Sequence, residues 1–311
     1  MHRLRAYYDY IRLAIINAAY PQVSEGRILR KTEKFLVRQR LNDLAYHSET
    51  KAISSDQLGP YEVVVSMTTH GKRIMTVHRA IESIIQQSIK PNRFVLYIGN
   101  TEYQDISQLP LVLQRQAARG LEIRFVKDQG PFTKLLPALR DFPDSSIITF
   151  DDDNYYPVNA IERLLLSHRR HPEAICSLAT RVLEWQTSGD LKPYNICEFS
   201  HKPEDSISCM YVAEGCGGVL YPPHALPDTV FDNSVYEKLT PHADDFWFKA
   251  MSLLKGTPVL AVGSYFSPDY ERYDDEDVQD VGLSQMNICQ DKNDQQLHAV
   301  FDYYNLYNKL A

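Results

Sequence analysis

Short apolar runs alternate with amphipathic stretches along the first half of the chain, and this alternation is the feature that most limits its fold. The apolar runs predict buried strands, and the stretches between them predict helices with one apolar face. Strands that alternate with helices in this way are typical of a mainly parallel sheet with helices packed on it. The sequence therefore predicts an α/β protein. The expected strands are 62–67, 94–99, 121–126 and 146–150, and the expected helices are 77–87, 111–118 and 137–140.

The second half of the chain is less regular, but it also contains helix and strand signals. Pro157 is expected to start a helix that runs to about His168. A glycine-rich turn leads into the apolar run 219–221, and Gly256 is expected to end a helix that begins near Asp244. A last strand is expected at 257–262, and the six acidic side chains of 271–280 predict a solvated loop. We divide the chain into a basic helical extension (1–60), a main domain (61–265) and a C-terminal acidic loop with a helical tail (266–311).

The charge of the chain is unevenly distributed. Its 311 residues carry 33 basic and 40 acidic side chains, a net charge of −7 that argues against a nucleic-acid partner. The first forty residues nevertheless hold nine Lys and Arg against three acids, so this end has a net charge of +6 and the remainder −13. An apolar helical face accompanies the basic residues, formed by Leu4, Tyr7, Ile11 and Ile15. Two interpretations stay open, a helix packed on the main domain or a helix that contacts an anionic membrane surface.

The cysteines and the apolar segments indicate the compartment. The five cysteines are widely spaced and form no CxxC pair, so we expect neither a zinc ribbon nor a disulfide framework. The longest apolar stretch near the start, residues 13–20, is far too short to span a bilayer. We therefore expect a cytoplasmic protein, either soluble or attached peripherally at the inner face of a membrane.

Three consecutive carboxylates, Asp151, Asp152 and Asp153, follow the expected strand 146–150 directly. Such a row repels itself unless a cation or hydrogen-bond donors compensate the charge. Hard divalent cations such as Mg²⁺ and Mn²⁺ prefer oxygen ligands of this kind, and ligands of parallel sheets bind at the carboxyl ends of the strands. The competing interpretation is an acidic turn that caps the helix near Pro157.

Several segments, in this order, are similar to the motifs of GT-A-fold glycosyltransferases, most closely those of the bacterial family-two type. The resemblance covers residues 61–265. It includes Val64–Thr69 followed by Arg73, the helix end 83–88 with Pro91, the strand that ends in Asp-x-Asp, the glycine-rich segment 215–221, and Ala243-Asp244-Asp245 at the start of a helix.

The resemblance implies a GT-A (Rossmann-like) fold and a metal-dependent enzyme that moves a sugar from a nucleoside diphosphate sugar to a hydroxyl of a saccharide or lipid-linked acceptor. A divalent cation, Mn²⁺ or Mg²⁺, would stabilise the charge on the leaving diphosphate. It would be held by Asp153, with Asp151 and, as a third candidate, His298. The donor-binding residues would be Thr68, Thr69, Arg73, Asp128, Lys134, Asp151 and Asp152, and the acceptor-side residues Gly215, Gly217 and Gly218.

The two aspartates at 244 and 245 are the candidate catalytic residues. One of them, Asp244, is a candidate N-cap of the helix that follows, which would leave the other free to face the site. The match to the last acid of the family motif selects Asp245 as the general base that takes the proton of the acceptor hydroxyl. A single base with direct attack implies inversion at the anomeric carbon.

Most of these residues also have a simpler interpretation. Lys134 and Arg73 could be exposed surface side chains, and Asp128 could stabilise its own loop through an Asx turn. The three glycines could serve only a tight turn. Trp185 and Trp247 could stack on sugars or belong to the surface and the core.

Other functional classes fit the sequence less well. A haloacid-dehalogenase phosphatase also places Asp-x-Asp after a strand, but it needs a Thr or Val where Tyr155 follows Asn154. A sugar nucleotidyltransferase would carry a Gly-rich, Arg-containing loop after Val65, which is missing. A metal-dependent phosphotransfer enzyme and a catalytically weak carbohydrate-binding or scaffold relative of the transferases stay as alternatives.

Overall fold

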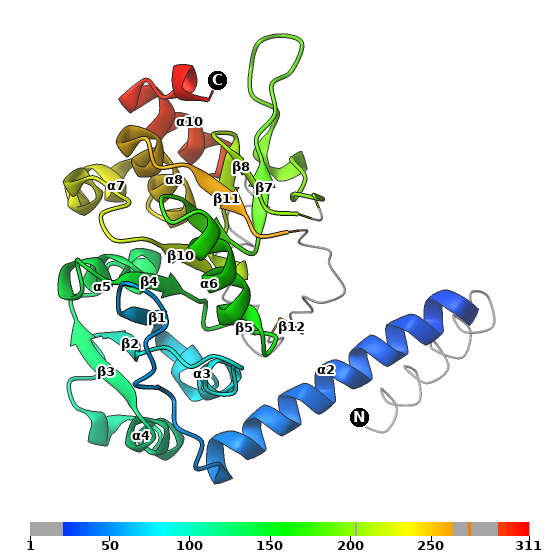
Figure 1. Cartoon of the computed structure of the whole chain (residues 1–311), viewed down its shortest axis with the longest axis vertical. Coiled ribbons are helices and arrows are strands. Elements are labelled where there is room, and N and C mark those ends of the chain that lie inside the picture. The colour runs from blue at the N-terminus through cyan, green and yellow to red at the C-terminus, as the bar shows by residue number, and fades with distance from the viewer. Residues whose placement is uncertain (1–20, 203, 264–272, 275–291, 311) are drawn as a thin grey trace, which may run out of the picture.

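The computed structural model describes residues 21–202, 204–263, 273–274 and 292–310. Its centre is an eight-stranded sheet in the order β3-β2-β1-β4-β10-β6-β11-β8, with helices on both sides (Figure 1). The strands of this sheet are β1 (Val63–Thr69), β2 (Arg93–Gly99), β3 (Leu121–Val126), β4 (Ser146–Thr149), β6 (Ile175–Ser177), β8 (Ser206–Ser208), β10 (Val219–Tyr221) and β11 (Val259–Ala261).

The sheet is mostly parallel. Strands β1 to β4 all run in one direction, and β11 runs parallel to β6. Strand β10 is antiparallel to both of its neighbours, β4 and β6, and β8 is antiparallel at the edge. The near-continuous apolar sequence of β1 follows from burial on both faces, because alternate side chains such as Val64 and Val65 enter different clusters of the core.

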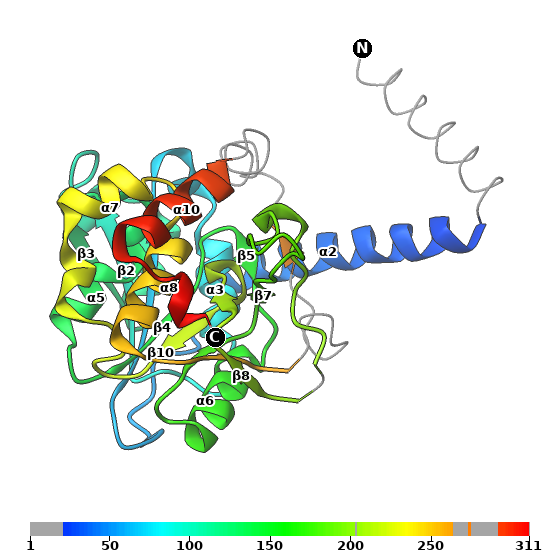
Figure 2. The same ribbon diagram turned by 90° about the horizontal axis from the view of Figure 1, so that it is seen from above.

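Two hydrophobic clusters fill the space between the sheet and its helices. One contains Val64, Ile147 and Val219 and is closed by α5, α7, α8 and α10. The other contains Val65 and Ile148 and is closed by α3, α4 and α6. The resulting helix–sheet–helix layering can be followed in Figures 1 and 2. The helices are α2 (Pro21–His47), α3 (His78–Ile85), α4 (Leu111–Ala118), α5 (Leu136–Asp141), α6 (Ala160–Arg170), α7 (Asn233–Leu239), α8 (Asp244–Lys255) and α10 (Lys292–Tyr304).

The structure confirms the predicted α/β class and most of the predicted elements. The helix at 111–118 and the strand at 121–126 have the predicted bounds, and Gly256 ends α8 in a left-handed conformation. The prediction that Pro157 starts a helix is wrong, because α6 begins only at Ala160. Two small ladders were not predicted because their strands are too short for a periodic pattern. They pair β7 (Thr180–Val182) with β9 (Tyr211–Ala213), and β5 (Asn154–Tyr155) with β12 (Tyr273–Asp274).

Helix α2 is anchored to the domain at its C-terminal end. Leu41 and Ala45 are buried against the domain, and α2 packs on α3 and α4. Close to this contact, Arg119 forms a buried ion pair with Glu82 at 2.8 Å and donates from its Nε to the carbonyl of Thr50 at 2.7 Å. The preceding part of α2 extends away from the domain in both views (Figures 1 and 2).

Two sequence predictions lie wholly or partly outside the described residues. The apolar face of Leu4, Tyr7, Ile11 and Ile15 is one, and the acidic segment 271–280, apart from its two residues in β12, is the other. Among the helices of the described part of the chain, none combines the length and the hydropathy that crossing a bilayer requires.

Candidate active site

The topology of the sheet brings three distant segments to one edge. Strands β1 and β4 are parallel neighbours, so Thr69 and the residues after Thr149 emerge side by side. Strand β10 is antiparallel to β4, with Val219 opposite Thr149, so the segment just before Val219 lies at the same edge. The acid motif and the glycine-rich segment 215–218 therefore meet although they are more than sixty residues apart in sequence.

The middle aspartate of the acid motif is buried and fully paired. Thr69 Oγ1 donates to Asp152 Oδ2 at 2.7 Å, and Arg73 Nη1 donates to Asp152 Oδ1 at 2.6 Å. Arg73 Nη2 also reaches Asp153 Oδ2 at 3.2 Å, so one guanidinium bridges two of the three carboxylates. Burial opposes the charge of Arg73, but Asp152 and Asp153 outweigh it and raise the pKa of the guanidinium. Arg73 is thus a buried component of the site and not an exposed arginine.

Lys134 compensates the remaining charge. Its Nζ lies 2.8 Å from Asp151 Oδ1 and 3.0 Å from Asp244 Oδ2, and the side chain is buried. Burial disfavours the ammonium, yet the carboxylates of Asp151, Asp244 and Asp245 raise the pKa of Lys134 well above its usual value. The interpretation as a surface lysine is wrong, because this lysine joins the acid motif to the start of α8.

The start of α8 differs in one respect from the prediction. The N-cap position is Ala243 and not Asp244, which is the first residue of the helix and whose carboxylate pairs with Lys134. Asp245 Oδ1 accepts a hydrogen bond of 3.0 Å from the backbone N–H of Gly215. Burial and the adjacent Asp244 raise the pKa of Asp245 well above the usual aspartate value. Burial also raises the pKa of Asp244, although Lys134 opposes that shift.

Close packing explains why the segment 215–218 needs glycine. A Cβ on Gly215 would lie 2.4 Å from Lys134 Nζ, and a Cβ on Gly217 would lie 2.3 Å from the Cβ of Ala179. Gly218 has a φ of +98°, which side chains rarely adopt, and a Cβ there would meet the ring of Phe150. Of the three glycines, Gly215 therefore lies directly against the charged groups.

Other predicted site residues make local contacts. Asp128 Oδ1 accepts from the backbone N–H of Gly130 at 2.9 Å, which is an Asx turn, and Thr68 Oγ1 donates to the carbonyl of Tyr97. On α10, His298 Nδ1 lies 2.8 Å from the hydroxyl of Tyr307. Of the two tryptophans, Trp247 is in the core and Trp185 is about half exposed.

Sequence reasoning missed residues that hold the site together. Tyr156 accepts from the backbone N–H of Asp151 at 2.9 Å and donates to the carbonyl of Cys216 at 3.1 Å, so it ties the acid motif to the glycine-rich segment. Glu214 directly precedes that segment and forms a 2.6 Å ion pair with Arg181. An acid next to a glycine-rich turn was a visible signal, but the roles of Tyr156 and Arg181 depend on tertiary contacts that carry no local pattern.

The acid motif suits a hard divalent cation in its chemistry. Asp151 and Asp153 keep 26% and 18% of their side-chain surface exposed, whereas Asp152 keeps 5%. The two outer carboxylates are thus the accessible oxygen donors. In the part of the chain that the structure describes, no group of three His, Cys, Asp or Glu side chains is arranged to bind a metal ion. Mg²⁺ commonly completes its coordination with water and substrate oxygens.

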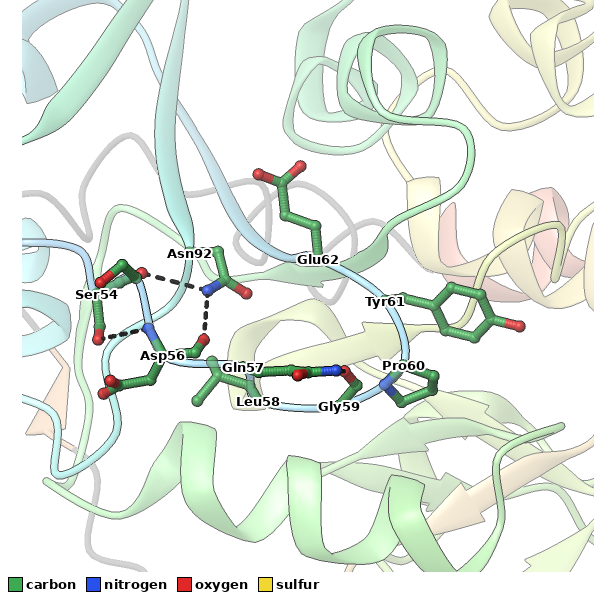
Figure 3. Close-up of a pocket in the computed structure, with 10 residues that line it drawn as sticks. Ser54, Asp56, Gln57, Leu58, Gly59, Pro60, Tyr61, Glu62 and Asn92 are labelled. Carbon is green, nitrogen blue, oxygen red and sulfur yellow. Dashed lines mark hydrogen bonds between the residues drawn. The ribbon is translucent and has the colours of Figure 1, made fainter.

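A separate hollow of about 410 Å³ lies at the opposite, amino-terminal edge of the sheet (Figure 3). It is lined by residues 54–62 and by Asn92, which lie just before β1 and β2. The Asn92 side chain donates to the carbonyls of Ser54 and Asp56 and so supports the wall of this hollow. The hollow contains none of the predicted site residues.

Comparisons with known proteins found solved structures of similar fold and no matching sequence family. No protein-family model matches the sequence, and no curated protein matches it. The solved structure of GalNAc-T7 with UDP, GalNAc and Mn²⁺ is similar over 70% of this chain and 44% of that chain, with 12% sequence identity and a TM-score of 0.42. The chain thus spans less than half the length of the chain in that structure.

Proposed function

We propose that this chain is a GT-A-fold glycosyltransferase of the family-two type that transfers a sugar from a nucleoside diphosphate sugar to a hydroxyl group. The observation that carries the proposal is the meeting of the acid motif, Lys134 and the acids of α8 at the carboxyl edge of the sheet. Loss of a nucleoside diphosphate leaves extra negative charge on its oxygens, and fixed cations in a buried site stabilise such charge strongly. Lys134 and Arg73 are cations of this kind.

In this proposal the donor is bound by the acid motif. Asp151 and Asp153 would hold Mn²⁺ or Mg²⁺, which when bound neutralises charge on the diphosphate. Asp152 positions Arg73 and is itself fixed by Thr69. Lys134 would add a positive charge next to the oxygens of the diphosphate. Asp128 and Thr68 would lie toward the nucleoside, and His298 stays a proposed third metal ligand.

Asp245 would act as the general base. Its Oδ1 is fixed by the Gly215 N–H, so the other carboxylate oxygen can accept the proton of an acceptor hydroxyl. A raised pKa suits this role, because a base works best when its pKa lies near the operating pH. Direct attack with one base inverts the anomeric carbon. The acceptor would be a saccharide or a lipid-linked saccharide, bound beside Gly215, Gly217 and Gly218, within a transferase domain of residues 61–265.

A donor-binding experiment tests the proposal. We would measure thermal unfolding of the full chain with a panel of nucleoside diphosphate sugars, each with and without Mn²⁺, together with hydrolysis of the sugar nucleotide. Metal-dependent stabilisation by one member of the panel is the expected result. Asp153→Asn should lose it, whereas Asp144→Asn should keep it, because Asp144 is exposed and pairs only peripherally with His224. A chain that no sugar nucleotide stabilises, with or without metal, is not a transferase of this class.

We also propose that the basic end of the chain contacts an anionic membrane surface on the cytoplasmic side. Three apolar side chains of α2, Leu29, Phe35 and Leu36, are each more than half exposed in a helix with six basic and three acidic residues. Basic side chains near an anionic surface contribute about 1 kcal/mol each, and salt screens this attraction.

Vesicle co-sedimentation tests this contact. The full chain should sediment with vesicles of phosphatidylcholine and 30% phosphatidylglycerol, release at high salt, and ignore pure phosphatidylcholine. Replacing Leu29, Phe35 and Leu36 with Ser should weaken sedimentation. The control is Leu111→Ser, because Leu111 is even more exposed but lies on α4. Indifference to anionic vesicles, or equal loss in the control, would contradict the proposal.

A further inference from the structure

A second carboxylate lies beside the proposed base. Glu214 follows β9 and directly precedes Gly215, whose backbone N–H is bonded to Asp245. The two acids therefore flank one glycine. Their proximity also affects the pKa of Asp245. Burial and Asp244 raise this pKa, and the charge of Glu214 raises it further. Glu214 thus belongs to the acceptor side of the site, and the proposed function does not use it.

The position of Glu214 is rigidly determined. Its Oε1 accepts from Arg181 Nε at 2.6 Å and from the hydroxyl of Tyr194 at 2.7 Å. The Arg181 guanidinium lies over the rings of Tyr194 and Phe199, at 5.1 and 4.3 Å from their centroids. Tyr194 is held in turn, since its backbone N–H donates to Asp294 of α10 at 2.7 Å. Contacts from separate parts of the fold therefore converge on one oxygen of one carboxylate.

The second oxygen of Glu214 is differently placed. Among the described residues, Oε2 has one hydrogen-bond donor, the thiol of Cys216 at 3.8 Å, and the side chain keeps 13% of its surface exposed. A structural ion pair of this fold looks different. Glu82 is completely buried, and both of its oxygens accept from Arg119 and from neighbouring glutamines. A strongly oriented carboxylate whose second oxygen accepts only from a weak thiol donor is the arrangement expected of a group that binds a ligand donor.

We infer that Glu214 is an acceptor-specificity residue, whose Oε2 accepts a hydrogen bond from a hydroxyl of the acceptor sugar other than the attacking one. The inference rests on the proposed transferase function. Asp245 would take the proton of the attacking hydroxyl, and Glu214, on the other side of Gly215, would bind a second hydroxyl and so fix the orientation of the ring. The acceptor is then a saccharide with at least two free hydroxyl groups near the bond that forms.

The experiment compares transfer with hydrolysis of the same sugar nucleotide. The probes are a panel of methyl glycosides of hexoses and N-acetylhexosamines as acceptors, and water as the acceptor in the hydrolysis reaction. Glu214→Gln keeps the shape but makes the bond to Oε2 weaker. It should raise the acceptor KM roughly 10- to 100-fold, the scale of one hydrogen bond to a charged group, and leave the rate of donor hydrolysis unchanged.

Two further variants separate acceptor binding from folding. Tyr194→Phe removes one donor to Oε1 and keeps the ion pair with Arg181, so it should raise the acceptor KM less than Glu214→Gln and in the same direction. Glu184→Gln is the matched control, because Glu184 pairs with Lys192 in the same region and is 44% exposed. It should change neither reaction.

The outcomes distinguish this inference from the proposed function. If the parent neither hydrolyses nor transfers any sugar nucleotide, the proposed function fails and this inference with it. If the parent transfers and Glu214→Gln has the parental acceptor KM, only the inference is overturned. A parallel loss of transfer and hydrolysis in both Glu214→Gln and Tyr194→Phe would assign the network a structural role, and a parent that hydrolyses donor but uses no saccharide of the panel would also overturn it.

Discussion

Replacement of Lys134 by Met should destabilise the fold as well as the site. The side chain is buried, and its Nζ lies within 3.0 Å of Asp151 and Asp244, with Asp245 close enough to influence its pKa. Lys134→Met removes the ammonium and leaves these carboxylates facing one another without a cation. Breaking a buried ion pair from one side costs about 3 to 5 kcal/mol. In a chain of this size about 2 °C of melting temperature corresponds to 1 kcal/mol, so the midpoint should fall by about 6 to 10 °C.

The pKa shifts of the neighbouring aspartates determine whether the stability of Lys134→Met increases or decreases with pH. Burial raises the pKa values of Asp244 and Asp245, and Lys134 opposes both shifts. Without Lys134 the pKa values of Asp244 and Asp245 rise further. At pH values above the usual carboxyl pKa, the folded variant therefore binds more protons than the unfolded chain. Its stability therefore decreases as the pH rises, and the deficit relative to the parent should be largest at pH 8 and shrink toward pH 5.

Thermal unfolding at pH 5, 6, 7 and 8 measures both effects. The control is Lys192→Met, because Lys192 forms a comparable 2.9 Å ion pair with Glu184 at the surface. Exposed pairs contribute less than about 1 kcal/mol, so this control should stay close to the parent. A Lys134→Met chain as stable as the parent at pH 8, or a deficit that does not vary with pH, would refute the reasoning.

Three further substitutions test separate groups. Asp153→Asn should abolish stabilisation by UDP and Mn²⁺ in a thermal-shift assay while the unliganded midpoint stays near the parental value, because Arg73 keeps its bond to Asp152. Asp245→Asn should lower kcat for transfer by roughly two to four orders of magnitude, as expected for a lost general base, with unchanged donor affinity. Burial lowers the pKa of Lys249 to about 7, so the parent should gain stability as pH rises from 7 toward 10. Lys249→Met should remove that gain and be more stable at pH 6 in urea titrations, by on the order of 4 kcal/mol.

Each of these has a result that would contradict it. Manganese-dependent UDP binding by Asp153→Asn would exclude this residue as a metal ligand. Equal losses of turnover and donor affinity in Asp245→Asn would place that carboxylate on the donor side. A parent whose urea midpoint does not change between pH 6 and 9 would show that Lys249 is not held neutral, since the folded and unfolded chains would then bind the same number of protons there.

Much of the fold could be predicted because its elements have strong local patterns. Residues 121–126 form a continuous strand between turn residues, and this strand was predicted with its exact bounds. The isoleucines of 77–87 repeat with helical spacing, and this helix was predicted with small errors at its ends. The small strands β5, β7, β9 and β12 have two or three residues each, and only pairing with a distant partner makes them strands. Pro157 misled the prediction, because a proline suited to a first helical turn is equally suited to the loop before it.

The carboxylates of the candidate site could be predicted from the sequence more readily than its buried lysine and arginine. Three adjacent aspartates after a strand are a rare local signal, whereas a single lysine or arginine is most often exposed. The burial of Lys134 and Arg73 follows from the parallel pairing of β1 with β4 and the antiparallel insertion of β10. Similarly, nothing local to Asp244 indicates that it pairs with Lys134, more than a hundred residues earlier. Charge compensation in this site is a property of the sheet topology.

The attachment of α2 has a mechanical consequence. The helix joins the domain through the buried residues Leu41 and Ala45 and through a linker whose carbonyl at Thr50 is bonded to Arg119, the partner of the buried Glu82. At about 1.5 Å per residue, Leu29 lies about 18 Å beyond Leu41 along the helix axis. A partner that binds the outer part of α2 would therefore be connected to the domain through a continuous helix and not through a flexible segment. Binding of a partner to the outer part of α2 would therefore restrict both the distance and the orientation of the sheet relative to that partner.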